Sequence, residues 1–140
     1  MAIPQHLRLE FVTPERAIVH EEVDEVVLPG EAGFFGVRPG HAPLLAALAT
    51  GEMWYRQGTE TKYAFVAGGF AEVVGDRVSV LAPVAERAEE IDLARAEAAQ
   101  RRAEDRLARP KSDMDFERAR IALIRAVSRL RVSKHSRPRS

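Results

Sequence analysis

Hydrophobic and polar residues alternate with a period of two at the start of the chain. Leu7, Leu9 and Phe11 alternate with Arg8 and Glu10, which is typical of a strand with one buried face. Similar short apolar runs predict further strands at residues 23–28, 53–56, 63–67, 70–74 and 77–81. Short strands without intervening helices favour an antiparallel sandwich or a flattened barrel over residues 1–85.

Glycine and proline divide these strands. Pro29-Gly30 is expected to stop the strand at 23–28, and the glycines and prolines between 30 and 43 predict a tight loop region. Gly68-Gly69 lacks the third glycine, the helix and the lysine of a phosphate loop, so it predicts a bulge or a strand bend. Pro83 is expected to end the last strand.

After Glu86 the apolar period lengthens to about 3.6, which predicts helices. Pro110 separates two helical stretches, and Ser112 followed by Asp115 resembles a capping box for the second. The short connection predicts an antiparallel two-helix hairpin over residues 86–134. Its apolar positions are Leu93, Ala96, Ala103 and Leu107 in the first helix and Phe116, Ala119, Leu123, Val127 and Leu130 in the second. Alanines allow close packing but bury little apolar area, so the seam between the helices is expected to be weak. Residues 135–140 predict a disordered basic tail.

The sign of the net charge also changes between residues 85 and 86, where the predicted helices begin. Residues 1–85 hold 6 Lys and Arg against 11 Asp and Glu, whereas residues 86–140 hold 15 against 10. A basic end of this kind can bind an acidic protein surface, a nucleic acid or anionic lipid.

Composition excludes several kinds of site. The chain has no cysteine, so disulfides and thiolate metal sites are excluded, and the four histidines lack metal-ligand spacing. No nucleophile with a matching base is evident, and we expect no catalytic residue and no metal. No apolar run approaches the ~20 residues of a membrane helix, and no signal peptide is recognisable, so we expect a cytosolic protein or one peripheral to a membrane.

The junction between the two halves holds the most informative motif. It places a carboxylate and a guanidinium three residues apart on one face of a helix start, in the stretch Ile91-Asp92-Leu93-Ala94-Arg95-Ala96. The carboxylate can accept hydrogen bonds from an amine or a ribose hydroxyl, and the guanidinium can bind phosphate. A helix cap beside a solvated arginine is the alternative interpretation.

Two stripes of arginines follow the motif. Arg95, Arg102 and Arg106 share one face of the first predicted helix, and Arg118, Arg125 and Arg129 repeat that spacing on the second. The stripes would repel each other unless an anion or an acidic partner lies between them. Two solvated faces diluted by acidic neighbours are the alternative.

Taken together, the chain resembles the epsilon subunit of bacterial F-type ATP synthase over residues 5 to about 132. The segments that carry the resemblance are Thr13-Pro14-Glu15, Val27-Leu28-Pro29-Gly30, Gly33-Phe34-Phe35-Gly36-Val37, Pro39-Gly40-His41-Ala42-Pro43-Leu44, Gly68-Gly69-Phe70-Ala71-Glu72-Val73, Val78-Ser79-Val80-Leu81 and residues 85–92. Each segment alone is a weak sign of this family, but their order and spacing together are specific to it.

The resemblance implies an α+β fold, mainly β, with a sandwich of about ten strands before the two-helix hairpin. It implies a non-catalytic rotor subunit on the central stalk of a proton-translocating ATP synthase. The partners implied are the gamma subunit, the ring of c subunits and the alpha and beta subunits of the catalytic head, on the cytoplasmic face of the bacterial plasma membrane. We expect no nucleic-acid partner and no membrane insertion, and the isolated chain is expected to be monomeric or dimeric.

The resemblance also implies regulation. In this family the hairpin can lie folded on the sandwich or extend into the catalytic head, where it blocks ATP hydrolysis. Some members bind ATP on the folded hairpin through a motif that residues 91–96 match in full. By position the ATP-binding residues would be Glu86, Ile91, Asp92, Arg95, Ala96, Arg102, Arg125 and Arg129. The extended hairpin would meet an acidic segment of the beta subunit through Arg118, Arg125, Arg129 and Arg131.

Three other functions stay open on the sequence. The chain could be a purely structural coupling subunit whose motif only caps a helix. It could be a nucleic-acid adaptor that uses its basic helix, although the acidic first half and the absence of an aromatic stacking ladder count against this. A stand-alone hydrolase is the weakest alternative, because a nucleophile, a metal site and a phosphate loop are all missing.

Overall fold

The computed structural model describes residues 5–136 of the 140-residue chain. Within these described residues ten strands precede two helices, as the resemblance implies. The strands are β1 (Leu7–Val12), β2 (Ala17–Val23), β3 (Glu25–Gly30), β4 (Gly33–Val37), β5 (Leu44–Ala47), β6 (Thr50–Gln57), β7 (Glu60–Ala67), β8 (Phe70–Val74), β9 (Arg77–Leu81) and β10 (Val84–Arg87). A 3-10 turn, η1 (Ala88–Glu90), leads to helices α1 (Leu93–Ala108) and α2 (Asp113–Ser133) and to a second 3-10 turn, η2 (Lys134–Ser136).

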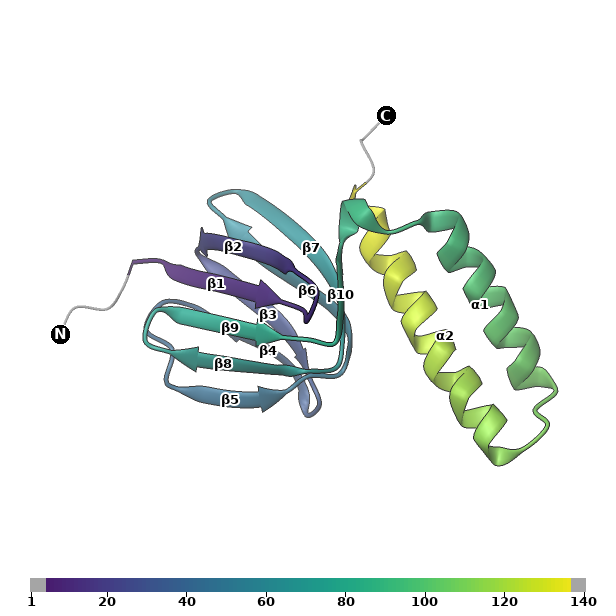
Figure 1. Ribbon diagram of the computed structural model, residues 1–140. Helices are drawn as coiled ribbons and strands as arrows, with labels where there is room; N and C mark the ends of the chain where they lie inside the picture. Colours follow the sequence, from purple (N-terminus) through teal and green to yellow (C-terminus); the bar gives the residue numbers. More distant parts are fainter. Residues whose placement is uncertain (1–4, 137–140) are drawn as a thin grey trace.

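The strands form two five-stranded sheets that pack face to face, so the sandwich predicted from the sequence is confirmed (Figure 1). One sheet has the order β2-β1-β9-β8-β5 and the other the order β10-β7-β6-β3-β4. The pairing of β1 with β9 is parallel and the other strand pairs are antiparallel. We call the second sheet the helix-side sheet, because its outward face carries α2.

The core lies between the two sheets and follows the alternation seen in the sequence. Leu7, Leu9 and Phe11 of β1 point inward and are almost fully buried, together with Leu28 and Met53 from the opposite sheet. Each such side chain contributes roughly 1.5–3 kcal/mol relative to an exposed position. The two sheets therefore form a rigid support to which the hairpin is attached.

Two expectations about the glycine-rich region were wrong. The strand expected at 23–28 begins at Glu25, because the chain bends at Asp24, and it continues through Pro29 and Gly30. Pro29 is tolerated because the pairing of β3 with β6 ends at Val27. Residues 33–37 of the expected loop region form the strand β4, which pairs with β3 along its full length.

The sequence also missed β2, β5 and β10. Pro83 follows β9, but it does not end the sandwich, because β10 pairs with β7 from Val84↔Ala67 to Arg87↔Ala64. Glu86 and Arg87 therefore belong to the sheet, two residues beyond the expected boundary at 85. Gly68 and Gly69 have φ of +75° and +98° in the bend between β7 and β8, as their spacing predicted.

Both helices have the caps that the sequence predicts. Asp92 accepts a hydrogen bond from the backbone N–H of Arg95 at 3.1 Å, and Ser112 accepts one from Asp115 at 3.0 Å. In a capping box the carboxylate of Asp115 would accept a second hydrogen bond from the N–H of Ser112. Here it accepts that bond from the N–H of Lys111 instead, at 3.1 Å. The antiparallel hairpin is confirmed.

Alanines form the seam between α1 and α2. Ala96 and Ala103 of α1 and Ala119 and Ala126 of α2 are buried. The larger apolar residues of α2 do not all join this seam, and Phe116 is 44% exposed. The helix has two neighbours, α1 and the sandwich, and its apolar residues are divided between them.

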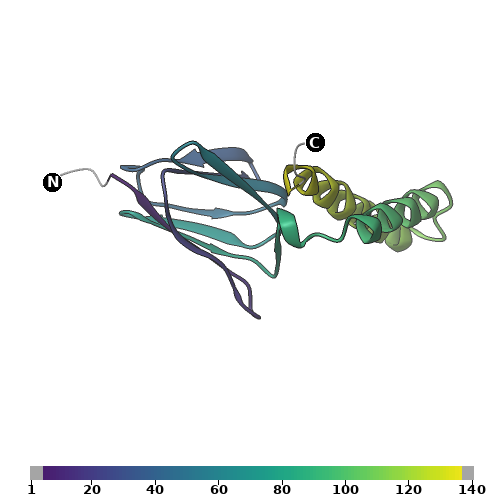
Figure 2. The same ribbon diagram turned by 90° about the horizontal axis from the view of Figure 1, so that it is seen from above.

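The sandwich holds the C-terminal half of α2. In both ribbon views α2 lies between α1 and the sandwich (Figures 1 and 2). Val132 is fully buried in a cluster with Phe65, Ala67 and Ala88, on the outward face of the helix-side sheet and separate from the main core. Within residues 5–136 no helix is long and apolar enough to cross a membrane.

Residues 135 and 136, which were expected to be part of a disordered tail, lie in the 3-10 turn η2. His135 lies in η2 and stacks on Tyr63 of β7, with ring centroids 3.4 Å apart. Its Nε2 atom is 3.4 Å from Oε1 of Glu52. These contacts order residues 135 and 136, and the rest of the expected tail, 137–140, lies outside the described residues.

Candidate functional site

The strand-to-helix junction at 86–96 places residues of the sandwich beside residues of the hairpin. Glu86 is held by the pairing of β10 with β7, whereas Asp92 and Arg95 begin α1. The turn η1 between them is tied by a hydrogen bond from the N–H of Arg87 to Glu90 at 3.0 Å. The site therefore spans the connection between a fixed sheet and a helix.

A pocket of about 390 Å³ lies at this junction, between β10, α1 and α2. This volume is within the range of small-ligand sites. Its lining residues are Glu86, Glu90, Ile91, Asp92, Arg95, Ala96, Ala99, Arg102, Ala126 and Arg129. We call it the junction pocket. Small alanine side chains on both helices leave the space, and the charged residues surround it.

Arg129 ties α2 to the sandwich at one side of the junction pocket. Its Nε atom donates to Oε1 of Glu86 at 2.6 Å, and its guanidinium carbon lies 4.6 Å from the centre of the Phe65 ring. Both members of the ion pair are partly buried, so the attraction is screened less than at the open surface. Among residues 5–136 the two Nη atoms of the same guanidinium have no hydrogen-bond partner, so they can donate to a ligand.

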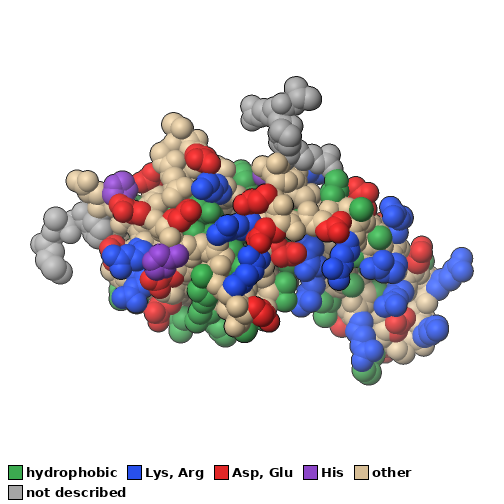
Figure 3. Space-filling model, turned by 45° about the horizontal axis from the view of Figure 1, so that its top comes forward, with side chains coloured by type: hydrophobic (Ala, Val, Ile, Leu, Met, Phe, Trp, Pro, Cys, Tyr) green, Lys and Arg blue, Asp and Glu red, His purple; other side chains and the backbone are tan. Residues whose placement is uncertain are grey.

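Three arginines converge on the junction pocket. Arg95 and Arg102 lie two turns apart on one face of α1, and Arg129 faces them from α2. Figure 3 shows Lys and Arg side chains gathered over the helical part of the molecule. Three guanidinium groups favour a ligand with several negative charges, and the carboxylates of Glu86 and Asp92 can accept hydrogen bonds from its neutral part.

Seven of the eight residues expected to bind ATP line this pocket. Arg125 does not, and its side chain is exposed on α2 one turn before Arg129. Arg118 is exposed as well, and Arg131 lines a different hollow against the sandwich. Sequence reasoning missed Glu90, Ala99, Ala126 and Phe65. The 3.6-residue period could have indicated Ala99, one turn after Arg95, whereas no local signal indicates Phe65.

Arg16, in the loop between β1 and β2, ties the turn η1 to the sandwich. Its Nη1 atom lies 2.7 Å from Oε2 of Glu90. This hydrogen bond, opposed in part by burial and aided by the N–H of Arg87, holds the pKa of the Glu90 carboxyl below its usual range. The ion pair therefore fixes the point at which the chain leaves the sheet.

Arg16→Gln is expected to lower the stability of the protein at neutral pH but not in acid. A carboxyl whose pKa is lower in the folded state stabilises the fold above its unfolded pKa, about 4.3, and loses that effect as the pH falls through the folded value. Urea unfolding at pH 7 and at about pH 3 measures the difference. Arg77→Gln is the control, because Arg77 forms no ion pair within residues 5–136. A difference of equal size at both pH values would contradict the assignment.

Comparisons with known proteins agree with this architecture. Residues 6–88 match the family model of the ATP synthase delta/epsilon chain beta-sandwich domain, and residues 89–134 match that of its long alpha-helix domain. The ATP synthase epsilon chain of Syntrophobacter fumaroxidans is 50% identical over 93% of this chain and 97% of its own length. That of Nitratidesulfovibrio vulgaris is 52% identical over 90% and 94%.

Solved structures show the same fold. A chain in the structure of the Euglena gracilis mitochondrial ATP synthase, with OSCP, F1 and c-ring, superposes with a TM-score of 0.82. It is 24% identical, and the match covers 91% of this chain and 81% of the other. A chain of the central stalk and c-ring of the Tetrahymena thermophila enzyme gives a TM-score of 0.56 at 14% identity, over 96% and 98%. With both domains matched in order and bacterial relatives about half identical along nearly the whole chain, the protein belongs to the family of ATP synthase epsilon chains.

Proposed function

We propose that this chain is a non-catalytic rotor subunit of a proton-translocating F-type ATP synthase, peripheral to the cytoplasmic face of the bacterial plasma membrane. It couples the gamma subunit to the c-ring on the central stalk. Its hairpin restrains ATP hydrolysis when it extends into the catalytic head, and ATP bound in the junction pocket favours the folded form. The names of the relatives support the role as a subunit of ATP synthase. The geometry of the junction pocket supports the binding of ATP to the folded hairpin.

One observation carries the ATP proposal: Arg95, Arg102 and Arg129 converge on one pocket that also holds Glu86 and Asp92. The phosphates would bind the three guanidinium groups, and the adenosine part would lie against the carboxylates, beside Ile91 and Ala96. The exposed side chain of Arg125 lies one helical turn from Arg129, so a change of rotamer would bring it to the phosphates.

ATP would favour the folded hairpin by mass action. The junction pocket contains residues of β10, α1 and α2, so it exists only while the three lie together. A ligand that binds this form alone stabilises it by about 2.7 kcal/mol at a hundredfold excess over Kd. This is a substantial bias for a hairpin whose seam is made of alanines.

The folded form also occupies an arginine that the extended form would need. Arg118, Arg125 and Arg131 are exposed, but Arg129 is paired with Glu86 and packed on Phe65. Leaving the sandwich would free this fourth guanidinium for an acidic segment of the beta subunit. The same residue would then stabilise either state, with a different partner in each.

The sheet on the far side of the sandwich offers a surface for the gamma subunit. Leu45, Phe70, Val74 and Leu81 are 69%, 56%, 55% and 57% exposed on β5, β8 and β9. The register pairs Phe70 directly with Leu81, so these two form one patch on the outward face. Exposed apolar patches of this kind are typical of protein interfaces, and this one lies on the sheet opposite the helix-side sheet.

A purely structural coupling subunit is the second candidate, and two observations favour it. Asp92 caps α1 through the N–H of Arg95, and Glu86 pairs with Arg129, so both carboxylates have partners within the protein. In that case the junction pocket would hold the hairpin in place without a ligand.

Calorimetric titration with ATP, with and without magnesium, distinguishes the two. Asp92→Ser keeps a good helix cap but removes the carboxylate, so it tests binding without unwinding α1. We expect saturable binding to the natural chain and roughly 10-fold to 100-fold weaker binding to Asp92→Ser, since a hydrogen bond to a charged group contributes about 1.5–3 kcal/mol. Glu97→Ala, which changes an exposed acid outside the pocket, should bind normally.

The assembled enzyme provides the functional readout. Hydrolysis by enzyme that carries Asp92→Ser should stay inhibited at ATP concentrations that release the natural form. Failure of the natural chain to bind ATP up to millimolar concentrations would leave the structural coupling role.

A further inference from the structure

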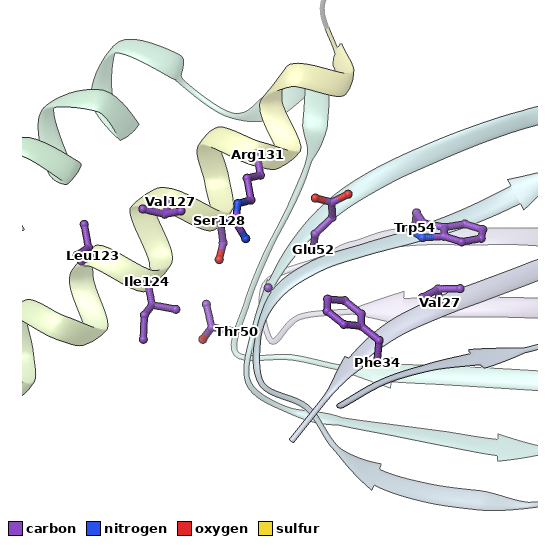
Figure 4. A pocket seen from close by; sticks show the side chains of 11 residues that line it. Val27, Phe34, Thr50, Glu52, Trp54, Leu123, Ile124, Val127, Ser128 and Arg131 are labelled. Carbon is purple, nitrogen blue, oxygen red and sulfur yellow. The ribbon is translucent and has the colours of Figure 1, made fainter. Parts of the chain in front are cut away.

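A second and larger hollow lies between α2 and the outward face of the helix-side sheet, with a volume of about 700 Å³. Figure 4 shows α2 on one side of it and the sheet on the other. It is lined by Val27, Phe34, Thr50, Gly51, Glu52, Trp54, Leu123, Ile124, Val127, Ser128 and Arg131. We call it the wedge. It shares no lining residue with the junction pocket.

The two walls of the wedge are apolar and incompletely covered. Phe34 on the sheet side is 69% exposed, and Ile124 on α2 is 38% exposed. Trp54 and Leu123 are half-buried on opposite walls. The docked part of α2 lies further toward its C-terminus, around Val132, so the helix diverges from the sheet here and leaves the walls unfilled.

A single cation is placed at the wedge. Arg131 extends from α2 toward the opening between the walls (Figure 4), and it forms no ion pair within residues 5–136. The one acidic residue of the lining, Glu52, is 3.4 Å from His135. Ser128 and Thr50 add hydroxyl groups. The lining thus holds one guanidinium without an ion pair within residues 5–136, two hydroxyls and one carboxylate that lies against His135, and the guanidinium can bind the charged end of an amphipathic anion.

We propose that the wedge binds a soluble amphipathic monocarboxylate of the fatty-acid type. The carboxylate binds Arg131, and the hydrocarbon chain lies between the aromatic wall of Phe34 and Trp54 and the aliphatic wall of Leu123 and Ile124. The volume is within the range of sites for single small molecules. Removal of the exposed apolar walls from water supplies the affinity, and the guanidinium fixes the orientation.

The wedge has a regulatory consequence that rests on the proposed function. Both walls exist together only while α2 is docked, so its ligand stabilises the folded hairpin by the same mass action as ATP. The ligand also occupies Arg131, which is one of the arginines proposed to meet the beta subunit. A fatty acid would therefore release inhibition of hydrolysis independently of ATP.

Trp54 is the only tryptophan of the chain and lies in the wedge, so its fluorescence reports binding directly. The full chain is titrated, below the micellar concentration, with 11-bromoundecanoate, whose bromine quenches tryptophan on contact. We expect saturable quenching, with roughly tenfold weaker binding for Arg131→Gln and for the neutral probe 11-bromoundecanol. Arg118→Gln removes an exposed arginine of the same helix outside the wedge and should bind as the natural chain does.

Three results would overturn the proposal. They are equal quenching by the acid and the alcohol, unchanged affinity in Arg131→Gln, and binding that is seen only with vesicles of anionic phospholipid. The titration is independent of the nucleotide, because Asp92→Ser should retain the quenching. If ATP fails to bind and 11-bromoundecanoate binds, the ATP proposal fails while the wedge stands.

Discussion

Phe65→Ala is expected to release the hairpin from the sandwich while the sandwich stays folded. Phe65 is fully buried on the outward face of β7, in the cluster with Val132, Ala67 and Ala88 that is separate from the core between the sheets. It also carries the guanidinium of Arg129. Truncation of a buried phenylalanine costs about 3–5 kcal/mol, and here most of that loss falls on the contact between α2 and the sheet.

Hydrogen exchange measures this effect by region. Amides of α2 should lose protection in Phe65→Ala, whereas those of β1 and β9 should keep it. Phe70→Ala is the matched control, because Phe70 is 56% exposed on the opposite sheet. In the assembled enzyme, Phe65→Ala should deepen inhibition of hydrolysis at low ATP. Equal protection of α2 in the natural chain and in Phe65→Ala would show that this cluster does not hold the hairpin.

Gly69→Ala is expected to destabilise the sandwich by about 2–4 kcal/mol, since a strained backbone and a steric overlap add together. Gly69 has a φ of +98°, and a Cβ atom there would lie 2.1 Å from the carbonyl oxygen of Leu81. The overlap is with backbone atoms of Leu81 and Ala82 at the end of β9, so a side-chain rotation cannot relieve it.

The matched control is Gly75→Ala. Gly75 has a φ of +60° and open space around its Cα, so this substitution should cost only about 1 kcal/mol for the left-handed conformation. Urea unfolding followed by circular dichroism measures both. If the two substitutions have equal effects, the close approach to Leu81 is not the source of the strain.

The sequence predicted those parts of the fold that depend on local periodicity. The alternation in β1, the caps at Asp92 and Ser112 and the alanine seam were all confirmed, because each depends on neighbours within a few residues. β10 was missed because its four residues follow Pro83 and are stabilised by distant β7. Pro29 was misjudged for a related reason, since whether a proline disrupts a strand depends on where its partner strand ends.

The candidate site shows the same limit. Spacing along one helix brought Arg95 and Arg102 together, and the structure places them in one pocket. The helical period alone cannot assign the faces of α2, because this helix has two neighbours. For this reason Arg129 reaches the junction pocket, whereas Arg131 faces the sandwich and Arg125 faces outward.

The junction pocket takes Glu86 from the fixed sheet and Asp92 from the helix that would move, with only the turn η1 between them. If ATP binds there as proposed, its affinity is not a property of the lining residues alone. The apparent Kd equals the intrinsic Kd divided by the folded fraction of the molecules. Two relatives with identical lining residues would differ tenfold in apparent affinity if one kept its hairpin folded only a tenth of the time. On the proposed mechanism, substitutions in the alanine seam or near Val132, which do not line the junction pocket near the phosphates, would change the apparent Kd for ATP through the folded fraction.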